Sequence, residues 1–318
     1  MHSSPHELTD RFIIFGGTAS PDLAAAIAAE LGTPLGACAV ERFPDGELSV
    51  RLDEPVRGRE VFLVQSTSPP VNDHLIELLA FADACRRASA THLTAIIPYF
   101  GYARSDKRQA RREPITASMV AELLQAVSVS HVVTLDLHAP QIEGFFRIPV
   151  DSLTALPVLS QAISQRCSPD TVIVSPDVGR AKLAMAYAER LGTDFAVLHK
   201  RRASGTELEM THLAGNVRDR SCLIVDDMIS TGGTIVESVA ALRRAGARPE
   251  IKVAATHGLF VDGARERLSE TGVQEIIVTD TVPRHAQPWP QLHVVSSAPL
   301  LAAAIRRFLT AGSLSDLC

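Results

Sequence analysis

Residues 221–234 read Ser-Cys-Leu-Ile-Val-Asp-Asp-Met-Ile-Ser-Thr-Gly-Gly-Thr. The apolar run 222–225 is typical of a buried parallel strand, and two carboxylates, Asp226 and Asp227, follow it directly. Small, hydroxyl-bearing and glycine residues come next, and apolar residues then recur at helical spacing until Gly246. The stretch therefore predicts a strand, a tight turn and a helix in succession.

This strand, turn and helix together suit a sugar phosphate. Glycines let backbone N–H groups close on an anion, and the N-terminus of a helix adds partial positive charge. The hydroxyls of Thr231 and Thr234 can donate to phosphate oxygens, whereas Asp226 and Asp227 suit sugar hydroxyls or a hydrated divalent cation. An ordinary helix cap is the alternative, but the paired aspartates beside Thr-Gly-Gly-Thr favour phosphate binding.

Length and composition exclude several classes of protein. A chain of 318 residues, 46% hydrophobic and 21% charged, is globular and long enough for two domains. Its net charge of −5 argues against a general nucleic-acid binder. We expect no membrane partner and a cytoplasmic location, because no apolar run is long enough to span a bilayer and no signal peptide is evident. The five cysteines have no metal-like spacing and are expected to be reduced thiols.

Strands and helices are expected to alternate along the chain, which indicates an α/β fold with ligands at the carboxyl ends of parallel strands. The expected strands are 11–15, 48–52, 61–65, 93–97, 131–138, 171–175, 195–198, 222–225, 251–256, 275–279 and 292–295. Asn72 is expected to cap one helix and Pro114 to open another. We place the domain boundary between residues 152 and 153, near Pro149 and Pro157, giving domains 8–152 and 153–318.

Residues 42–48, Arg-Phe-Pro-Asp-Gly-Glu-Leu, contain a turn at Asp45-Gly46 that leads into a strand. Phe43 offers a stacking face, and the acidic side chains offer acceptors for an adenine amino group or ribose hydroxyls. A plain hairpin turn explains the local pattern equally well.

Residues 98–116 form a basic segment in an acidic protein, directly after an expected strand. Its cations are Arg104, Lys107, Arg108, Arg111 and Arg112. Basic loops are usually solvated, but a polyphosphate at this sheet edge would need several positive groups. We therefore interpret the segment as a nucleotide-binding loop that orders over its ligand.

Polar residues also mark the ends of two further strands. Asp136 and His138 close the segment 131–138 and are expected to share one face, and Asp177 follows the strand 171–175. A histidine at a strand end can hold a metal directly or through water, although a lone histidine is more often structural. A basic run then ends at Arg202.

From about residue 11 onward the chain resembles ribose-phosphate pyrophosphokinases, the phosphoribosyl diphosphate (PRPP) synthases, of the phosphate-dependent class I type. The matching segments occur in the family's order and spacing: 42–47, 98–104, 112–116, 136–142, 175–179, 200–202 and 226–234. The resemblance implies two similar phosphoribosyltransferase-type domains, each with a mainly parallel sheet flanked by helices. It also implies that the last helix packs back on the N-terminal domain.

The implied reaction transfers the β,γ-diphosphoryl group of Mg-ATP to the 1-hydroxyl of D-ribose 5-phosphate, giving PRPP and AMP for nucleotide biosynthesis. The implied cofactor is Mg²⁺, with ATP as a substrate and inorganic phosphate as an activator. The implied assembly is a homo-hexamer built from dimers, with composite ATP sites.

The resemblance also implies roles for individual residues. The ATP-binding residues would be Phe43, Asp45, Gly46, Glu47, Arg104, Ser105 and Asp106. The ribose 5-phosphate site would contain Arg202, Asp226, Asp227, Ser230, Thr231, Gly232, Gly233 and Thr234. His138 and Asp177 would mark the metal sites, and Lys200 and Arg202 would stabilise the transferring group as the catalytic pair.

The chain departs from the family pattern at several places. Ser105 stands where Gln is usual, Ser230 where Asp is common, and Arg147 replaces a usual acid near the domain junction. Residues 314–318 resemble the family's C-terminal tail only loosely.

Two alternative functions stay open at this point. A phosphoribosyltransferase would use PRPP without ATP, and a non-catalytic homologue would regulate a true synthase by co-assembly. The second alternative is disfavoured by the presence of His138, Asp177, Lys200 and Arg202.

Overall fold

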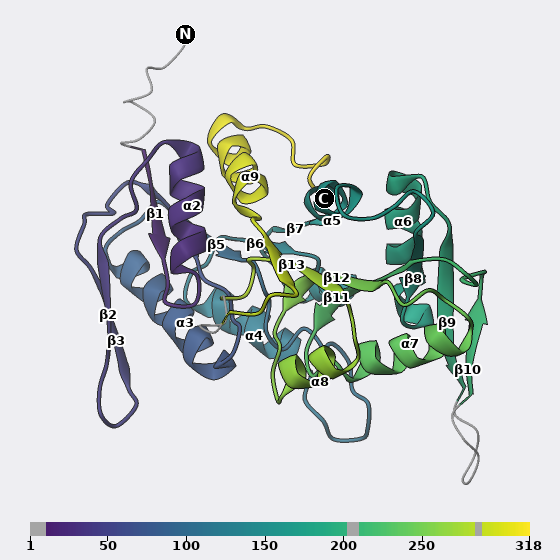
Figure 1. Ribbon diagram of the computed structural model, residues 1–318. Coiled ribbons are helices and arrows are strands. Elements are labelled where there is room, and N and C mark those ends of the chain that lie inside the picture. Colours follow the sequence, from purple (N-terminus) through teal and green to yellow (C-terminus); the bar gives the residue numbers. More distant parts are fainter. Residues whose placement is uncertain (1–10, 202–209, 284–287) are drawn as a thin grey trace. The chain divides into compact units, whose positions relative to one another are not determined.

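The computed structural model describes residues 11–201, 210–283 and 288–318. The chain divides into two compact α/β units (Figure 1). The first unit runs to Thr154 and also includes Thr281–Pro283 and Ser297–Cys318; the second begins at Ala155. The predicted fold class, parallel sheets flanked by helices, is confirmed. The sequence-based division into 8–152 and 153–318 stays a proposal for the functional domains.

The sheet of the first unit contains five parallel strands in the order β1-β4-β5-β6-β7. Their bounds are β1 Phe12–Gly16, β4 Glu60–Val64, β5 His92–Ile97, β6 His131–Leu135 and β7 Val150–Leu153. Apolar residues fill these strands without alternation because helices cover both faces of the sheet. Two short antiparallel strands, β2 (Cys38–Arg42) and β3 (Leu48–Leu52), form a separate hairpin.

The helices of the first unit are α2 (Pro21–Leu31), α3 (Val71–Arg87), α4 (Thr116–Ala126) and α9 (Ala298–Thr310), with a 3₁₀ turn η1 (Pro140–Phe145). Phe81 of α3 and Leu124 of α4 pack with Phe15 and Leu63 in one core. The C-terminal helix α9 lies beside α2, drawn in yellow and purple in Figure 1. The Phe308 and Phe62 ring centres lie 6.3 Å apart, so α9 completes the core of the first unit.

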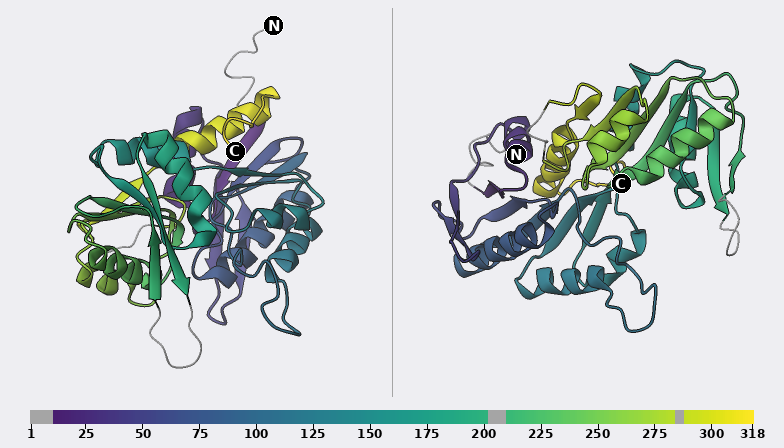
Figure 2. Two further views of the ribbon diagram at one scale, coloured as in Figure 1. Left: turned by 90° about the vertical axis from the view of Figure 1, so that its right-hand side faces the viewer. Right: turned by 60° about the horizontal axis from the view of Figure 1, so that its bottom comes forward.

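The sheet of the second unit contains seven strands in the order β10-β9-β8-β11-β12-β13-β14, parallel except for β10. Their bounds are β8 Val172–Ser175, β9 Phe195–Arg201, β10 Met210–Ala214, β11 Cys222–Ile229, β12 Ile251–Gly258, β13 Glu275–Thr279 and β14 Leu292–Val295. The helices are α5 (Leu156–Ser164), α6 (Ala181–Leu191), α7 (Gly233–Arg244) and α8 (Ala264–Glu270), with a 3₁₀ turn η2 (Val178–Arg180). Helix α5 contacts α6, and α7 contacts α8 (Figure 2). Apolar residues of α7 and α8 pack with those of β8, β11 and β12 in the second core.

Four local expectations need correction. Asn72 does not cap α3, because the helix begins after Pro70 and Asn72 lies in its first turn. Helix α4 begins at Thr116 and not at Pro114. Strand β6 ends at Leu135, and Asp136 takes a left-handed φ of +38°, so Asp136 and His138 do not share a strand face. Strand β11 continues to Ile229 because its pairing with β12 extends past the aspartates.

Candidate active site

The paired carboxylates Asp226 and Asp227 lie within β11 and are largely buried, with side chains 13% and 6% exposed. The backbone N–H of Asp227 donates to Oδ1 of Asp226 at 2.8 Å. Arg180, which ends the η2 turn, reaches both side chains. Its Nη2 lies 2.8 Å from Oδ2 of Asp227, and its Nε lies 3.4 Å from Oδ1 of Asp226. The structure thus brings together two carboxylates and a cation that no sequence motif had linked.

Burial raises the pKa of Asp226 far above its ordinary value, and the neighbouring Asp227 raises it further. The charge of Arg180 acts in the opposite direction. The pair therefore retains a proton at a higher pH than a solvated aspartate would. Hydroxyl groups of a sugar are well-matched partners, because they can donate to such carboxylates.

The loop Ser230–Gly232 joins β11 to α7 and has the features expected of an anion site. Gly232 adopts φ +77°, and a Cβ at this position would lie only 3.1 Å from Leu268, so the turn requires glycine. Thr231 and Thr234 are exposed at the start of α7, where helix N–H groups face solvent. A guanidinium nitrogen of Arg267, from α8, donates to the carbonyl oxygen of Thr231 and adds a cation beside the loop.

Asp177 is exposed and follows β8 directly, as predicted. Its Oδ1 accepts a hydrogen bond of 3.0 Å from the backbone N–H of Arg180. Through this bond Asp177 caps the N-terminus of the η2 turn. Asp177 is thus joined through one residue to the Asp226–Asp227 pair.

The basic residues predicted after β9 are only partly described. Lys200 lies in β9 opposite Thr211 of β10, and its side chain is outside the description. Arg202 lies outside the described residues altogether.

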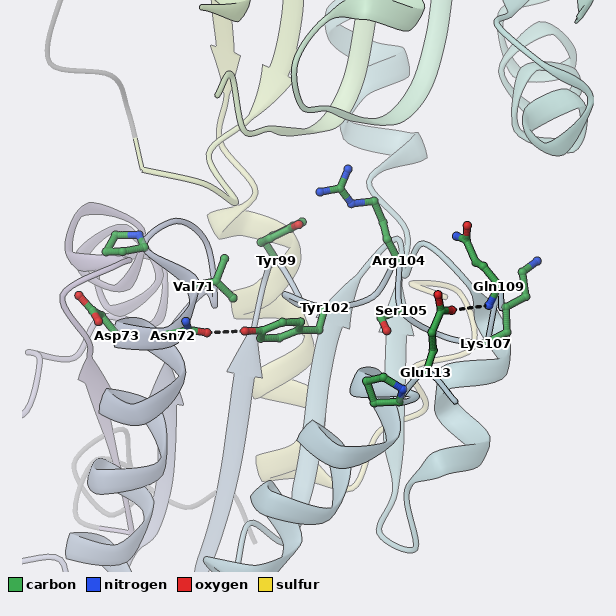
Figure 3. Close-up of a pocket in the computed structure, with 12 residues that line it drawn as sticks. Val71, Asn72, Asp73, Tyr99, Tyr102, Arg104, Ser105, Lys107, Gln109 and Glu113 are labelled. Carbon is green, nitrogen blue, oxygen red and sulfur yellow. Dashed lines mark hydrogen bonds between the residues drawn. The ribbon is translucent and has the colours of Figure 1, made fainter. Parts of the chain in front are cut away.

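A pocket of about 750 Å³ lies in the first unit, under the loop that follows β5 (Figure 3). Its lining residues are Pro70, Val71, Asn72, Asp73, Tyr99, Tyr102, Arg104, Ser105, Lys107, Gln109, Glu113 and Pro114. The volume suits a nucleotide-sized ligand. Of the predicted ATP-binding residues, Arg104 and Ser105 line this pocket.

The polar side chains of the pocket are mostly held by neighbours. The Tyr102 hydroxyl donates to Asn72, and Oε2 of Glu113 accepts from the backbone N–H groups of Gln109 and Ala110, each at 2.9 Å (Figure 3). Asp73 pairs with Arg42 at 3.0 Å.

The cations of the pocket are less constrained than its acids. Arg104 and Lys107 are exposed, and no ion pair engages either of them within the described part of the chain. Because the carboxylates are occupied and the cations are available, the pocket suits an anionic ligand.

Asp106 does not line the pocket. It is 8% exposed and accepts a hydrogen bond from the side-chain amide of Gln141. Its role in this structure is to fasten the loop to the η1 turn.

The four predicted ATP-binding residues of the β2–β3 hairpin are exposed at its tip: Phe43, Asp45, Gly46 and Glu47. Oδ1 of Asp45 accepts from the Glu47 N–H at 3.1 Å, and Gly46 adopts φ +94°. None of the four lines the pocket, although the Arg42–Asp73 ion pair joins the strand end next to the hairpin tip to a pocket residue. The ring of Phe43 is 42% exposed.

His138 is half-buried and follows the end of β6 in the first unit, whereas Asp177 belongs to the second unit. Within residues 11–201, 210–283 and 288–318, no group of three or more His, Cys, Asp or Glu side chains could hold a metal ion. Mg²⁺ keeps several waters and is often held by one or two carboxylates and substrate phosphates. The exposed carboxylate of Asp177 fits that mode of binding.

Among the described residues, no helix is both long and apolar enough to cross a membrane.

Comparisons with known proteins agree with one another over most of the chain. The model of the N-terminal domain of ribose phosphate pyrophosphokinase matches residues 12–127, and the phosphoribosyl synthetase-associated domain matches residues 202–318. The chain is 45% identical to a ribose-phosphate pyrophosphokinase of Chromobacterium violaceum, covering 97% of this chain and 95% of that protein. It is 47% identical to a protein of the same name from Rhodopirellula baltica, over 96% of this chain and 97% of the relative. The crystal structure of phosphoribosylpyrophosphate synthetase from Mycobacterium smegmatis is similar with a TM-score of 0.89 and 42% identity, over 95% of this chain and all of that one.

Proposed function

The chain belongs to the ribose-phosphate pyrophosphokinase family, and from this premise we propose how its two candidate sites divide the reaction. The protein is a transferase that makes PRPP for nucleotide biosynthesis. One observation supports the assignment of ribose 5-phosphate to the second unit. The buried Asp226–Asp227 pair in β11 lies just before the Ser230–Gly232 loop at the N-terminus of α7. Hydroxyl acceptors beside an anion cradle match ribose 5-phosphate, which carries a phosphate and sugar hydroxyls.

The two alternative functions are not favoured. A phosphoribosyltransferase would not account for a match that covers the first unit as well as the second. A non-catalytic homologue would not need Asp177, Asp226 and Asp227, which the structure keeps close together through Arg180.

The proposed reaction joins the 1-hydroxyl oxygen of ribose 5-phosphate to the β-phosphorus of ATP. The bond between the α,β-bridging oxygen and the β-phosphorus breaks, AMP leaves, and the proton of the hydroxyl is released. Such a transfer depends on holding the reactants in line and on neutralising charge on the phosphoryl oxygens. Binding and charge placement are therefore the main tasks of the chain.

The second unit is proposed to hold ribose 5-phosphate. Asp226 and Asp227 accept hydrogen bonds from sugar hydroxyls, while Ser230, Thr231 and the first residues of α7 hold the 5-phosphate. Those first residues of α7 are Gly233 and Thr234, and Gly232 and Arg202 are assigned to the same phosphate. Support comes from the burial of the carboxylates and the exposure of Thr231 and Thr234.

The first-unit pocket is proposed to hold ATP. Arg104 faces the polyphosphate, and Ser105 and Asp106 keep the loop in place through Thr116 and Gln141. Phe43, Asp45, Gly46 and Glu47 are proposed to contact the adenine side of an ATP bound to a neighbouring subunit. Their exposure at a hairpin tip supports that role.

Lys200 and Arg202 are proposed to stabilise charge on the transferring diphosphoryl group. His138 and Asp177 are proposed to mark the Mg²⁺ sites, each in its own unit and each binding directly or through water, and bound Mg²⁺ would neutralise phosphate oxygens of ATP. We further propose activation by inorganic phosphate, assembly of dimers into a hexamer, and a cytoplasmic location.

Phosphorus NMR of the purified protein with ATP, ribose 5-phosphate, Mg²⁺ and phosphate tests the proposal. We expect AMP and PRPP signals to grow together. ADP in place of AMP would refute the transfer of a diphosphoryl group. An absence of turnover by folded protein would instead favour a regulatory homologue.

A further inference from the structure

Arg180 occupies a central position that the sequence motifs do not indicate. It is the last residue of the η2 turn, and its side chain is only 20% exposed. The guanidinium reaches the two carboxylates of β11 with different nitrogens, Nη2 to Asp227 at 2.8 Å and Nε to Asp226 at 3.4 Å. A planar guanidinium that contacts two carboxylates in this way fixes the spacing between them and offsets their negative charge.

The backbone of the same residue makes a third connection. The N–H of Arg180 donates to Oδ1 of Asp177 at 3.0 Å, and Ser175 Oγ donates to the carbonyl of Asp177 at 2.6 Å. Asp177 is therefore held at one end of a three-residue turn whose other end is held by Asp226 and Asp227. Strands β8 and β11 are parallel neighbours, so all of these residues lie toward the carboxyl-terminal ends of adjacent strands in one sheet.

Two adjacent buried carboxylates repel each other, and each is expensive to keep in its charged form away from water. A nearby cation offsets part of this cost, and each carboxylate oxygen can accept more than one hydrogen bond. The vicinal hydroxyls of a ribose supply such donors at the required short spacing. A 2-deoxyribose lacks one of them and would leave an acceptor unpaired.

We propose that Arg180 is a positioning residue that holds Asp226 and Asp227 in the arrangement that recognises the vicinal hydroxyls of ribose 5-phosphate, and that aligns this pair with Asp177. The inference rests on the proposed placement of ribose 5-phosphate in the second unit. It assigns Arg180 no direct contact with the reacting atoms.

The test compares Arg180→Ala and Arg180→Lys with Arg190→Ala in the full chain. Arg190 is an exposed arginine in the last turn of α6, the helix that follows η2, so its truncation controls for loss of one positive charge nearby in the chain. For Arg180→Ala we expect the KM for ribose 5-phosphate to rise about 10- to 100-fold, the range for loss of a hydrogen bond to a charged group. The KM for ATP should change less than about twofold, since the pocket of the first unit is untouched.

Arg180→Lys should recover only part of the affinity, because an ammonium cannot reproduce the planar fork. The preference for ribose 5-phosphate over 2-deoxyribose 5-phosphate should fall in Arg180→Ala and stay unchanged in Arg190→Ala. Direct titration of ribose 5-phosphate onto each variant gives the same comparison without turnover. If Arg180→Ala does not fold, Arg180→Lys alone carries the test, with a smaller but measurable loss of sugar preference expected.

Equal rises in both KM values, or an unchanged sugar preference, would overturn the role of Arg180. Asp227→Asn separates this failure from failure of the proposed site. If Asp227→Asn binds ribose 5-phosphate as well as the parent protein does, the site assignment itself is wrong. If Asp227→Asn weakens binding but Arg180→Ala does not, only the role of Arg180 is wrong.

Discussion

The hydroxyl oxygen of Ser105 lies 3.1 Å from Oγ1 of Thr116 and accepts from the backbone N–H of Thr116 at 3.3 Å. These contacts close the loop after β5 onto the first residue of α4. Ser105 therefore holds the loop that lines the pocket.

Replacing Ser105 with Ala should destabilise the protein by about 1 kcal/mol, the usual cost of losing such a hydrogen bond at a helix start. Because the loop would be less well held, the KM for ATP should rise while the KM for ribose 5-phosphate stays constant. Thermal melting and steady-state kinetics measure both effects. A loss of stability with an unchanged KM for ATP would mean that Ser105 serves only the fold.

Phe43 gives a second test of the ATP assignment. Its ring is 42% exposed, so Phe43→Ala should change the free energy of unfolding by less than about 0.5 kcal/mol. If the ring stacks on adenine, the KM for ATP should rise about tenfold, the cost of losing a base–aromatic contact. Met185→Ala is the matched control, because Met185 is also 42% exposed but lies on α6. Identical KM values for the two variants would remove Phe43 from the site.

Asp177 can be tested for metal binding without losing its cap. The side-chain oxygen of Asn can accept the hydrogen bond from the Arg180 N–H just as that of Asp does. Asp177→Asn should therefore preserve the η2 turn and leave the melting temperature unchanged. The lost charge should raise the Mg²⁺ concentration needed for half-maximal rate about tenfold or more. Chelation of Mg²⁺ should stop turnover of the parent protein reversibly. An unchanged Mg²⁺ requirement in Asp177→Asn would exclude Asp177 as a metal ligand.

The raised pKa of Asp226 makes stability depend on pH. Between the ordinary pKa of an aspartate and the raised value, the folded chain binds more protons than the unfolded chain. Stability from this group therefore falls as the pH rises through that range. Asp226→Asn removes the dependence, so its melting temperature should exceed that of the parent by about 2 °C or more at alkaline pH.

The gain from Asp226→Asn should shrink toward acid pH, and ribose 5-phosphate binding should be weak at every pH. Asp219→Asn is the control, because Asp219 is exposed and Asn tolerates its left-handed φ of +57°. A melting difference that does not vary with pH would contradict the raised pKa.

Lys200 tests the charge-stabilising role. Lys200→Ala should lower turnover by about 100-fold or more, the cost of removing one group that stabilises transition-state charge. Its Kd for ATP should change far less, because the group acts on the transferring diphosphoryl group. Equal losses in turnover and in ATP affinity would contradict this role.

The elements that the sequence predicted well carry their own local signals. Helix α2 begins at Pro21 and ends at Leu31, and Gly32 follows with φ +67°, so a proline at the start and a glycine after the end marked its bounds. Strands β13 and β14 are short apolar runs and were found at their observed positions. The end of β6 carried no such signal, since Asp136 adopts its left-handed backbone without a glycine.

Only the part of the candidate site that lies in one contiguous segment of sequence could be predicted. The Asp226–Asp227 pair and the Ser230–Gly232 loop are contiguous, so the sequence displayed them together. Arg180 is 47 positions from Asp227 and meets it only because β8 pairs with β11. Arg267 reaches Thr231 from α8 in the same way. Contacts of this kind follow from sheet order, which the local pattern of residues does not encode.

The most direct test of diphosphoryl transfer follows the two terminal phosphates of ATP. The protein is given ribose 5-phosphate, Mg²⁺ and ATP labelled either on the β- or on the γ-phosphate, and the products are separated. We predict that both labels appear in PRPP and that neither remains with the adenosine nucleotide. Transfer of the γ label alone, with the β label retained in ADP, would contradict the account.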